Sequence, residues 1–124
     1  MDEDVAILVR IYDCFNARNI GGVLAVLTDD VTWANGMDGS HVHGHVALHD
    51  YWTRQWTTVS PHVEPLAFHR TADGAIVAEV RQSVRDLSGN PLQEQAHGLK
   101  DKTVQHSFRF RAGKVARFDI QDAA

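Results

Sequence analysis

The chain has 124 residues, of which 44% are hydrophobic and 23% charged, with a formal net charge of −4. This length supports a single hydrophobic core, so we expect residues 1–124 to form one domain. The negative charge argues against a nucleic-acid partner, because phosphate recognition needs a surplus of Lys and Arg. No apolar run approaches the roughly 18 residues of a membrane span, so we expect no membrane association.

The cellular compartment is predicted from missing signals alone. The acidic start MDEDVAIL differs from the basic start of a secretory signal. Cys14 is the single cysteine and has no partner for an internal disulfide. We therefore expect a cytoplasmic protein.

The first third of the chain predicts two helices and a strand. Apolar residues at helical spacing cover residues 4–18, and the stripe that they form includes Tyr12. A short second helix is expected within residues 20–30, since Asn19 is a suitable cap. Residues 30–37 alternate apolar and polar side chains, which is typical of a strand, and they run into the turn-rich NGMDGS.

A third helix and four strands follow. The helical pattern resumes over residues 45–59 and is stopped by the Ser-Pro pair at 60–61. Strand patterns then occupy residues 63–71, 74–87, 102–112 and 114–122. This order predicts an α+β fold in which three helices pack on one face of a curved antiparallel sheet.

Three of the predicted strands each place one polar residue among side chains that point to the core. These residues are Asn35, Gln82 and His106, and Tyr12 is the polar-tipped member of the first helix's stripe. A buried polar group without a partner costs roughly 1–3 kcal/mol. The four groups therefore bond one another, reach water at strand ends, or face a ligand. Their convergence from different elements favours a pocket.

Large apolar side chains are expected to form the walls of that pocket. Such walls with a few polar groups are typical of a small-molecule site, so we expect a small apolar molecule as the partner. The candidate wall residues are Trp33, Met37, Trp52, Trp56, Phe108 and Phe110. Trp52 and Trp56 are equally compatible with a plain hydrophobic core, because they lie at helical spacing.

Three segments carry a resemblance to a known superfamily: IYDCFNARNIGGVLAVLTDDVTW, GHVALHDYWTRQW and HSFRFRAGKVARFDI. Through them the chain resembles the ketosteroid-isomerase-like superfamily, which includes SnoaL-like polyketide cyclases, scytalone dehydratase and nuclear transport factor 2. The resemblance implies a cystatin-like α+β barrel: a cone-shaped curved antiparallel sheet wrapped around a long N-terminal helix and open at one end into an apolar cavity.

The resemblance also implies a homodimer that forms through the outer face of the sheet. That face is expected to carry Glu79, Arg81, Ser83, Arg85, Ser107, Arg109 and Arg111. This mixture of charged and polar residues suits pairing across an interface, and it suits solvated surface equally well.

The resemblance also assigns roles to three of the polar residues. Tyr12 matches a tyrosine that donates a hydrogen bond to the substrate's carbonyl oxygen. Asn35 stands where the isomerases have their general-base aspartate, so the usual proton shuttle lacks its base here. His106 matches a second, protonated aspartate. A neutral imidazole offers both an acceptor and a donor nitrogen, and its ordinary pKa of about 6.5 suits acid–base work.

We therefore predict acid–base catalysis on a small, largely apolar carbonyl compound such as a polyketide- or steroid-like molecule. His106 would be the base or acid, Tyr12 the oxyanion donor, and Asn35 and Gln82 would orient the substrate. No cofactor is expected. Two alternatives stay open: a ligand-binding or carrier protein without turnover, and a protein-interaction module of the same fold.

The run HVHGHVALHD at residues 41–50 holds four of the eight histidines. His45 and His49 have the i, i+4 spacing of paired metal ligands on a helix. However, Gly44 matches the glycine that opens the third helix in the superfamily, and no HExxH or CxxC pattern supplies further ligands. We expect no metal here, and interpret the run as a loop that crosses the cavity mouth.

Overall fold

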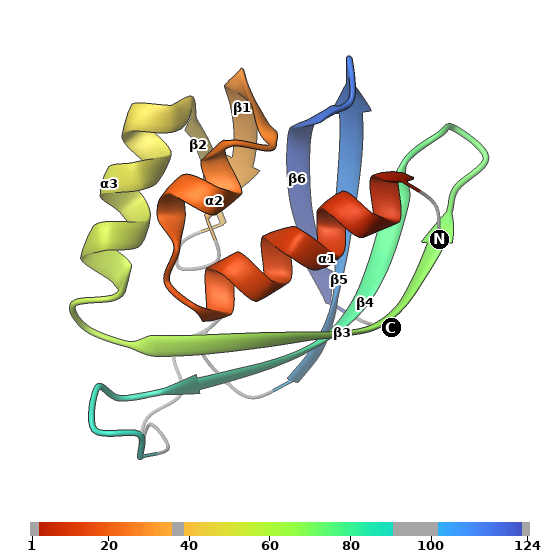
Figure 1. Cartoon of the computed structure of the whole chain (residues 1–124). Helices are drawn as coiled ribbons and strands as arrows, with labels where there is room; N and C mark the ends of the chain where they lie inside the picture. Colours follow the sequence, from red (N-terminus) through yellow and green to blue (C-terminus); the bar gives the residue numbers. More distant parts are fainter. Residues whose placement is uncertain (1–2, 36–38, 91–101, 123–124) are drawn as a thin grey trace.

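The structure is a computed structural model that describes residues 3–35, 39–90 and 102–122. Within them it contains helices and strands of the predicted α+β class (Figure 1). The elements are α1 (Glu3–Asn16), α2 (Ile20–Leu24), β1 (Leu27–Ala34), β2 (His41–His43), α3 (His45–Gln55), β3 (Ser60–Arg70), β4 (Ile76–Arg85), β5 (Lys102–Arg111) and β6 (Lys114–Asp122). None of the described helices is long and apolar enough to cross a bilayer.

One six-stranded sheet forms the body of the molecule, in the order β2-β1-β6-β5-β4-β3. Its neighbours are antiparallel, as predicted, except for β1 and β6, which run parallel. Parallel neighbours need a long connection, and the chain between Ala34 and Lys114 supplies it. The described part of the sheet is not closed, since β2 and β3 form its two edges.

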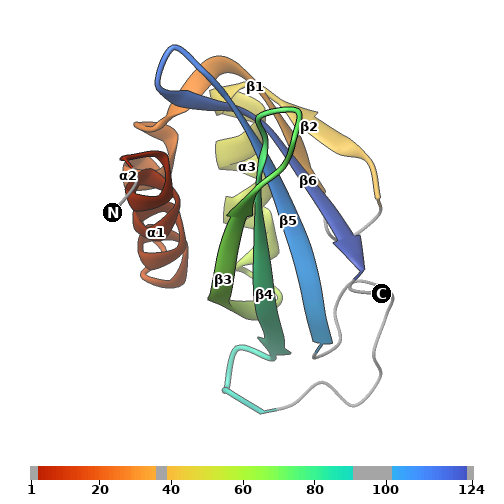
Figure 2. The ribbon, with the colours of Figure 1, turned by 90° about the vertical axis from the view of Figure 1, so that its right-hand side faces the viewer.

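The three helices lie on one face of the curved sheet, as Figure 2 shows. α1 packs against β3, and α3 lies over β1 and β2. Each helix turns an apolar stripe toward the sheet. The fully or nearly fully buried residues of these stripes are Leu8, Ile11, Tyr12, Val23, Leu48 and Trp52. The expected packing of helices on one face of a curved sheet is confirmed.

The alternation predicted for β4 and β5 is present in the structure. Residues of the inward set are buried along both strands: Ile76, Ala78, Val80, Val84, Val104, His106 and Phe108. Gln82, at the same face, is half-buried. Ala78 pairs with His106 in the antiparallel register. Because β5 is flanked by β4 and β6, this pairing places His106 in the interior of the sheet.

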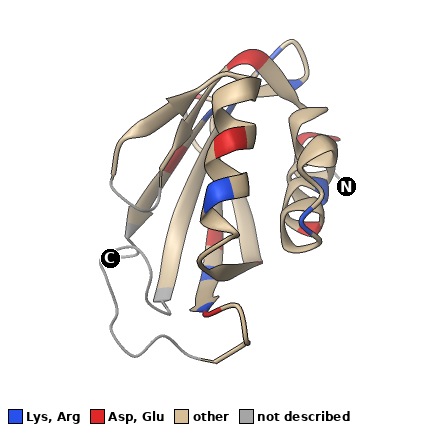
Figure 3. Ribbon diagram, turned by 90° about the vertical axis from the view of Figure 1, so that its left-hand side faces the viewer, with Lys and Arg blue, Asp and Glu red and all other residues tan. Residues whose placement is uncertain are grey.

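The outer face of the sheet carries exposed charges that pair within the chain. Arg109 lies 2.5 Å from Asp73, and Arg111 lies 2.5 Å from Asp30. Charged residues of both signs also lie on the helical side of the molecule (Figure 3). Dimerisation through the outer face stays a prediction.

Several element boundaries differ from the predicted ones: α2 ends at Leu24 rather than near residue 30, and β3 begins at Ser60 rather than at residue 63. α3 ends at Gln55 rather than at residue 59, because the hydroxyls of Thr57 and Thr58 donate to the carbonyls of Arg54 and Gln55. β1 spans Leu27–Ala34 rather than residues 30–37. β1 therefore starts three residues earlier than predicted, and it ends before Asn35 and Met37, the last two residues of the predicted alternating set.

A side-chain clamp fixes the end of α1 against the edge strand β3. The Asn16 amide donates to the carbonyl of Val63 (2.8 Å), and its oxygen accepts from the N–H of the same residue (3.0 Å). The amide thus pairs with β3 as a neighbouring strand would. Tyr12 is one helical turn before Asn16, so the clamp also sets the position of the Tyr12 ring.

Candidate functional site

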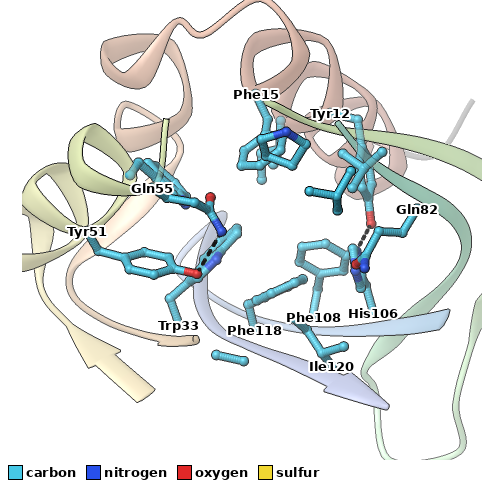
Figure 4. Close-up of a pocket in the computed structure, with 16 residues that line it drawn as sticks. Tyr12, Phe15, Trp33, Tyr51, Gln55, Gln82, His106, Phe108, Phe118 and Ile120 are labelled. Atoms are coloured by element: carbon cyan, nitrogen blue, oxygen red, sulfur yellow. Dashed lines mark hydrogen bonds between the residues drawn. The ribbon is translucent and has the colours of Figure 1, made fainter. Parts of the chain in front are cut away.

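A cavity of about 80 Å³ lies between the helices and the concave face of the sheet. Its walls are mostly apolar and come from α1, α3 and five strands (Figure 4). The apolar lining residues are Ile11, Phe15, Trp33, Ala34, Trp52, Pro61, Val63, Val84, Phe108, Phe118 and Ile120. The polar-tipped ones are Tyr12, Tyr51, Gln55, Gln82 and His106. This composition is typical of a small-molecule site.

Tyr12 from α1 and His106 from β5 meet in the wall of this cavity. The Tyr12 hydroxyl oxygen lies 2.7 Å from His106 Nδ1, a short hydrogen bond between residues 94 positions apart. The two rings are nearly parallel, at 7°, with centroids 5.8 Å apart. Tyr12 is only 3% exposed and His106 only 5%. The two side chains that the sequence singled out therefore share one buried contact.

Burial controls the charge of both partners. It lowers the pKa of His106 to about 3 from its ordinary 6.5, and it raises the pKa of Tyr12 well above 10. Both groups are therefore neutral near pH 7. The described lining residues include no Asp or Glu, so the cavity wall is uncharged and suits a neutral ligand.

Two proton arrangements satisfy the Tyr12–His106 bond. In the first, the Tyr12 hydroxyl donates to Nδ1, and His106 carries its proton on Nε2. In the second, Nδ1–H donates to the Tyr12 oxygen, which leaves the hydroxyl proton as a donor and Nε2 as an acceptor. The pair can therefore donate to a carbonyl oxygen in either arrangement, and in the second it also presents a basic nitrogen.

The other predicted site residues fall into two groups. Gln82, Trp33, Trp52 and Phe108 line the cavity with Tyr12 and His106. Asn35, Trp56 and Phe110 are absent from the described lining. Met37 lies outside the residues that the structure describes.

Asn35, for which strand alternation predicted an inward position, lies just beyond the end of β1 and is not among the described lining residues. β1 ends at Ala34, and Asn35 begins a turn. Its N–H donates to the carbonyl of Ser40 (2.8 Å), and its carbonyl accepts from the N–H of Gly39 (3.0 Å). The alternation of a pleated strand no longer sets side-chain direction once the backbone enters a turn.

Trp56 packs behind the cavity rather than in its wall. Its ring stacks on Trp52, with centroids 6.0 Å apart, and meets the edge of Phe15 at 5.3 Å. The guanidinium of Arg18 lies 5.0 Å from the Trp56 ring centroid, within the range of a cation–π contact. Trp56 therefore packs against Trp52 and Phe15, two residues of the cavity wall, and is not among the described lining residues itself.

Two polar residues of α3 were missed by the sequence analysis. Tyr51 and Gln55 line the cavity, and Gln55 Nε2 donates to the Tyr51 hydroxyl at 3.2 Å. A signal for both was present, since positions 48, 51, 52 and 55 follow the i, i+3, i+4, i+7 pattern of one helix face. Gln55 belongs to the predicted helical stripe, but neither it nor Tyr51 was proposed as a site residue.

The histidine run is not a loop across the cavity mouth. It divides at Gly44 into β2 and the start of α3, and Gly44 takes a φ of 84° that favours glycine. His41 Nε2 lies 2.9 Å from a carboxylate oxygen of Asp119, and His45 Nε2 lies 3.2 Å from the carbonyl oxygen of Leu27. In the described part of the chain, no three His, Cys, Asp or Glu side chains are grouped to hold a metal ion.

Comparison with known families identifies the chain's relatives. The sequence model of the SnoaL-like domain matches residues 8–118. The chain therefore belongs to the SnoaL-like domain family, and the resemblance found in the sequence is confirmed. No curated protein matches it.

Solved structures match the fold over nearly the whole chain. An NTF2-like protein of unknown function from Burkholderia pseudomallei superposes with a TM-score of 0.80 at 23% identity, covering 99% of this chain and 92% of that one. TerC, co-crystallised with polyporic acid, gives 0.79 at 22% identity, covering 98% and 92%. A proposed polyketide cyclase from Sinorhizobium meliloti gives 0.73 at 20% identity, covering 94% of each chain. At such identities the likeness concerns the fold.

Proposed function

We propose that this protein binds a small, largely apolar carbonyl compound in its cavity and converts it by acid–base catalysis, as an isomerase, cyclase or dehydratase. The observation that carries the proposal is the 2.7 Å contact between the Tyr12 hydroxyl and His106 Nδ1 in the wall of an apolar cavity. This contact brings a hydrogen-bond donor, the Tyr12 hydroxyl, next to a potential base, the His106 imidazole, and the proposed chemistry uses no cofactor.

The chemical step starts from the arrangement in which His106 Nδ1–H donates to the Tyr12 oxygen. The Tyr12 hydroxyl donates to the substrate's carbonyl oxygen, and His106 Nε2 removes a proton from the adjacent carbon. The C–H electron pair forms the enolate's C=C bond, and negative charge collects on the oxygen beside Tyr12. The new imidazolium and the enolate are opposite charges in a low-dielectric cavity, so they stabilise each other.

The enolate has three balanced outcomes. Return of the proton from His106 to a different carbon gives an isomer. Expulsion of a hydroxyl group from the next carbon, with that same proton, gives water and an unsaturated ketone. Attack on a second carbonyl of the same molecule closes a ring, and the proton then goes to the new alkoxide. Gln82 is a half-buried residue of the cavity wall, which supports its proposed role in orienting the substrate.

The comparisons support this reaction class without fixing the substrate. The family is SnoaL-like, a similar structure is a proposed polyketide cyclase, and another was crystallised with polyporic acid. A substrate with carbonyl groups on an unsaturated carbon skeleton agrees with these relatives and with the aromatic walls around Trp33 and Phe118.

Exchange of the methyl protons of acetophenone in D₂O tests the proposal, since every outcome above begins with proton removal beside the carbonyl. We expect exchange about 100-fold faster with the protein than with an equal concentration of free imidazole. The measurement is the decay of the methyl signal in proton NMR, with binding followed by calorimetry on the same samples.

A carrier function is the second candidate, and two observations favour it. The pKa of His106 is lowered to about 3 by burial, which makes the imidazole a weak base, and the described lining residues contain no carboxylate to replace it. A carrier would bind acetophenone and leave the exchange rate at the level of imidazole. If acetophenone neither binds to the protein nor exchanges its methyl protons faster with it, the catalytic function and the carrier function are both contradicted for aryl ketones.

A further inference from the structure

A second polar pair lies in the cavity wall, apart from Tyr12 and His106. Tyr51 and Gln55 are four residues apart on α3, so their side chains share one face of the helix. Gln55 Nε2 donates to the Tyr51 hydroxyl at 3.2 Å, and both residues are half-buried lining residues.

The two pairs stand on opposite sides of the cavity. Figure 4 shows Tyr51 and Gln55 on one side and Tyr12 with His106 on the other. Aromatic rings fill the wall between them. Trp33 stacks on Phe118 with centroids 4.1 Å apart, and Phe118 packs against Phe108 at 5.1 Å. The lining is thus polar at two ends and apolar in between.

The amide of Gln55 brings hydrogen-bonding capacity to the cavity wall. A side-chain amide has two N–H donors and a carbonyl oxygen, and that of Gln55 makes one hydrogen bond within the described part of the chain. Gln55 is half-buried, so its remaining donor and acceptor capacity is open to water or to a ligand in the cavity that it lines. A ligand oxygen or hydroxyl at this end of the cavity would use that capacity.

We propose that the cavity selects a neutral ligand with an oxygen function at each end of a flat apolar body, a carbonyl held by Tyr12 and His106 and a hydroxyl or second carbonyl held by Tyr51 and Gln55. This proposal rests on the proposed function for the carbonyl end. It assigns Tyr51 and Gln55 as specificity-determining residues and names the substrate class as hydroxylated or dicarbonyl ring ketones.

Calorimetric titration with acetophenone, 3-hydroxyacetophenone and 4-hydroxyacetophenone tests the proposal. Acetophenone lacks the second oxygen, and the other two place it at different ring positions. We expect one hydroxylated ketone to bind the wild type about fivefold more tightly than acetophenone, the effect of one net hydrogen bond. In the double variant Tyr51→Phe/Gln55→Leu the three ketones are expected to bind equally. In Tyr12→Phe all three should weaken, with the advantage of the hydroxyl retained.

The outcomes separate this proposal from the proposed function. If the wild type binds all three ketones equally, or if the double variant keeps the preference, Tyr51 and Gln55 do not select the ligand, while carbonyl binding at Tyr12 stands. If none of the ketones binds the wild type, both proposals are wrong for this class. Thermal unfolding of each variant confirms that the loss of preference occurs in a folded protein.

Discussion

Replacement of His106 by Gln is expected to slow the protein-catalysed exchange of acetophenone's methyl protons by about 100-fold or more. Glutamine approximates the size of histidine and still offers an oxygen to the Tyr12 hydroxyl, but its amide is not a base. The dissociation constant for acetophenone should change by less than about tenfold, since at most one hydrogen bond is altered. Proton NMR in D₂O gives the exchange rate, and calorimetry gives the affinity.

A matched control is His69→Gln, because His69 is an exposed histidine of β3 and is absent from the described cavity lining. Its exchange rate should equal that of the wild type. Unchanged exchange in His106→Gln would place the base elsewhere. If His106→Gln does not fold, Tyr12→Phe becomes the deciding variant, and wild-type exchange in it would exclude the Tyr12–His106 pair from the chemistry.

The second large effect concerns stability in acid. Burial lowers the pKa of His106 to about 3 in the folded protein, whereas an unfolded histidine has its ordinary pKa of about 6.5. Below pH 6.5 the unfolded chain therefore binds a proton that the folded chain does not, so stability present above pH 6.5 is lost as the pH falls toward 3. The expected loss is about 2 kcal/mol between pH 7 and pH 5, and about 4 kcal/mol near pH 3.

Urea unfolding at a series of pH values measures this loss in the wild type and in His106→Gln. Carboxylates contribute to the pH dependence of both proteins, so the difference between the two curves isolates the imidazole. The variant should lose about 2 kcal/mol less than the wild type between pH 7 and pH 5, and His69→Gln should follow the wild type. Parallel curves for wild type and His106→Gln would mean that His106 is protonated normally and is not buried in solution.

Local periodicity was sufficient to predict the inward faces of β4 and β5. Side chains alternate with a period of two in any strand, so Gln82 and His106 could be assigned to the concave face without knowledge of their neighbours. Tyr12 followed in the same way from the helical period of the first stripe. To predict the inward direction of these three side chains, it was enough to locate the strands and the helix along the sequence.

Features set by distant contacts could not be predicted in this way. The parallel pairing of β1 with β6 depends on where the end of the chain enters the sheet. Trp52 and Trp56 are four residues apart, and the sequence does not show that Trp52 lines the cavity while Trp56 packs against Phe15 and Arg18. Asn35 was misplaced because the turn to Gly39 and Ser40 ends β1 before it.

The polar members of α3 were a different kind of omission. Tyr51 and Gln55 belong to the same helix face as Leu48 and Trp52, and the sequence contained that information. The candidate wall residues were chosen by size and apolar character, so Trp52 of this face was selected and its polar neighbours Tyr51 and Gln55 were not. The position of Tyr51 and Gln55 in the cavity wall is evident only from the three-dimensional structure.

A crystal structure of the wild-type protein with bound acetophenone tests the central claim most directly. The account predicts the ketone inside the cavity, with its carbonyl oxygen about 3 Å from the Tyr12 hydroxyl or from a ring nitrogen of His106. A ketone bound in the cavity with its oxygen directed away from both side chains, or bound only outside the cavity, would contradict it.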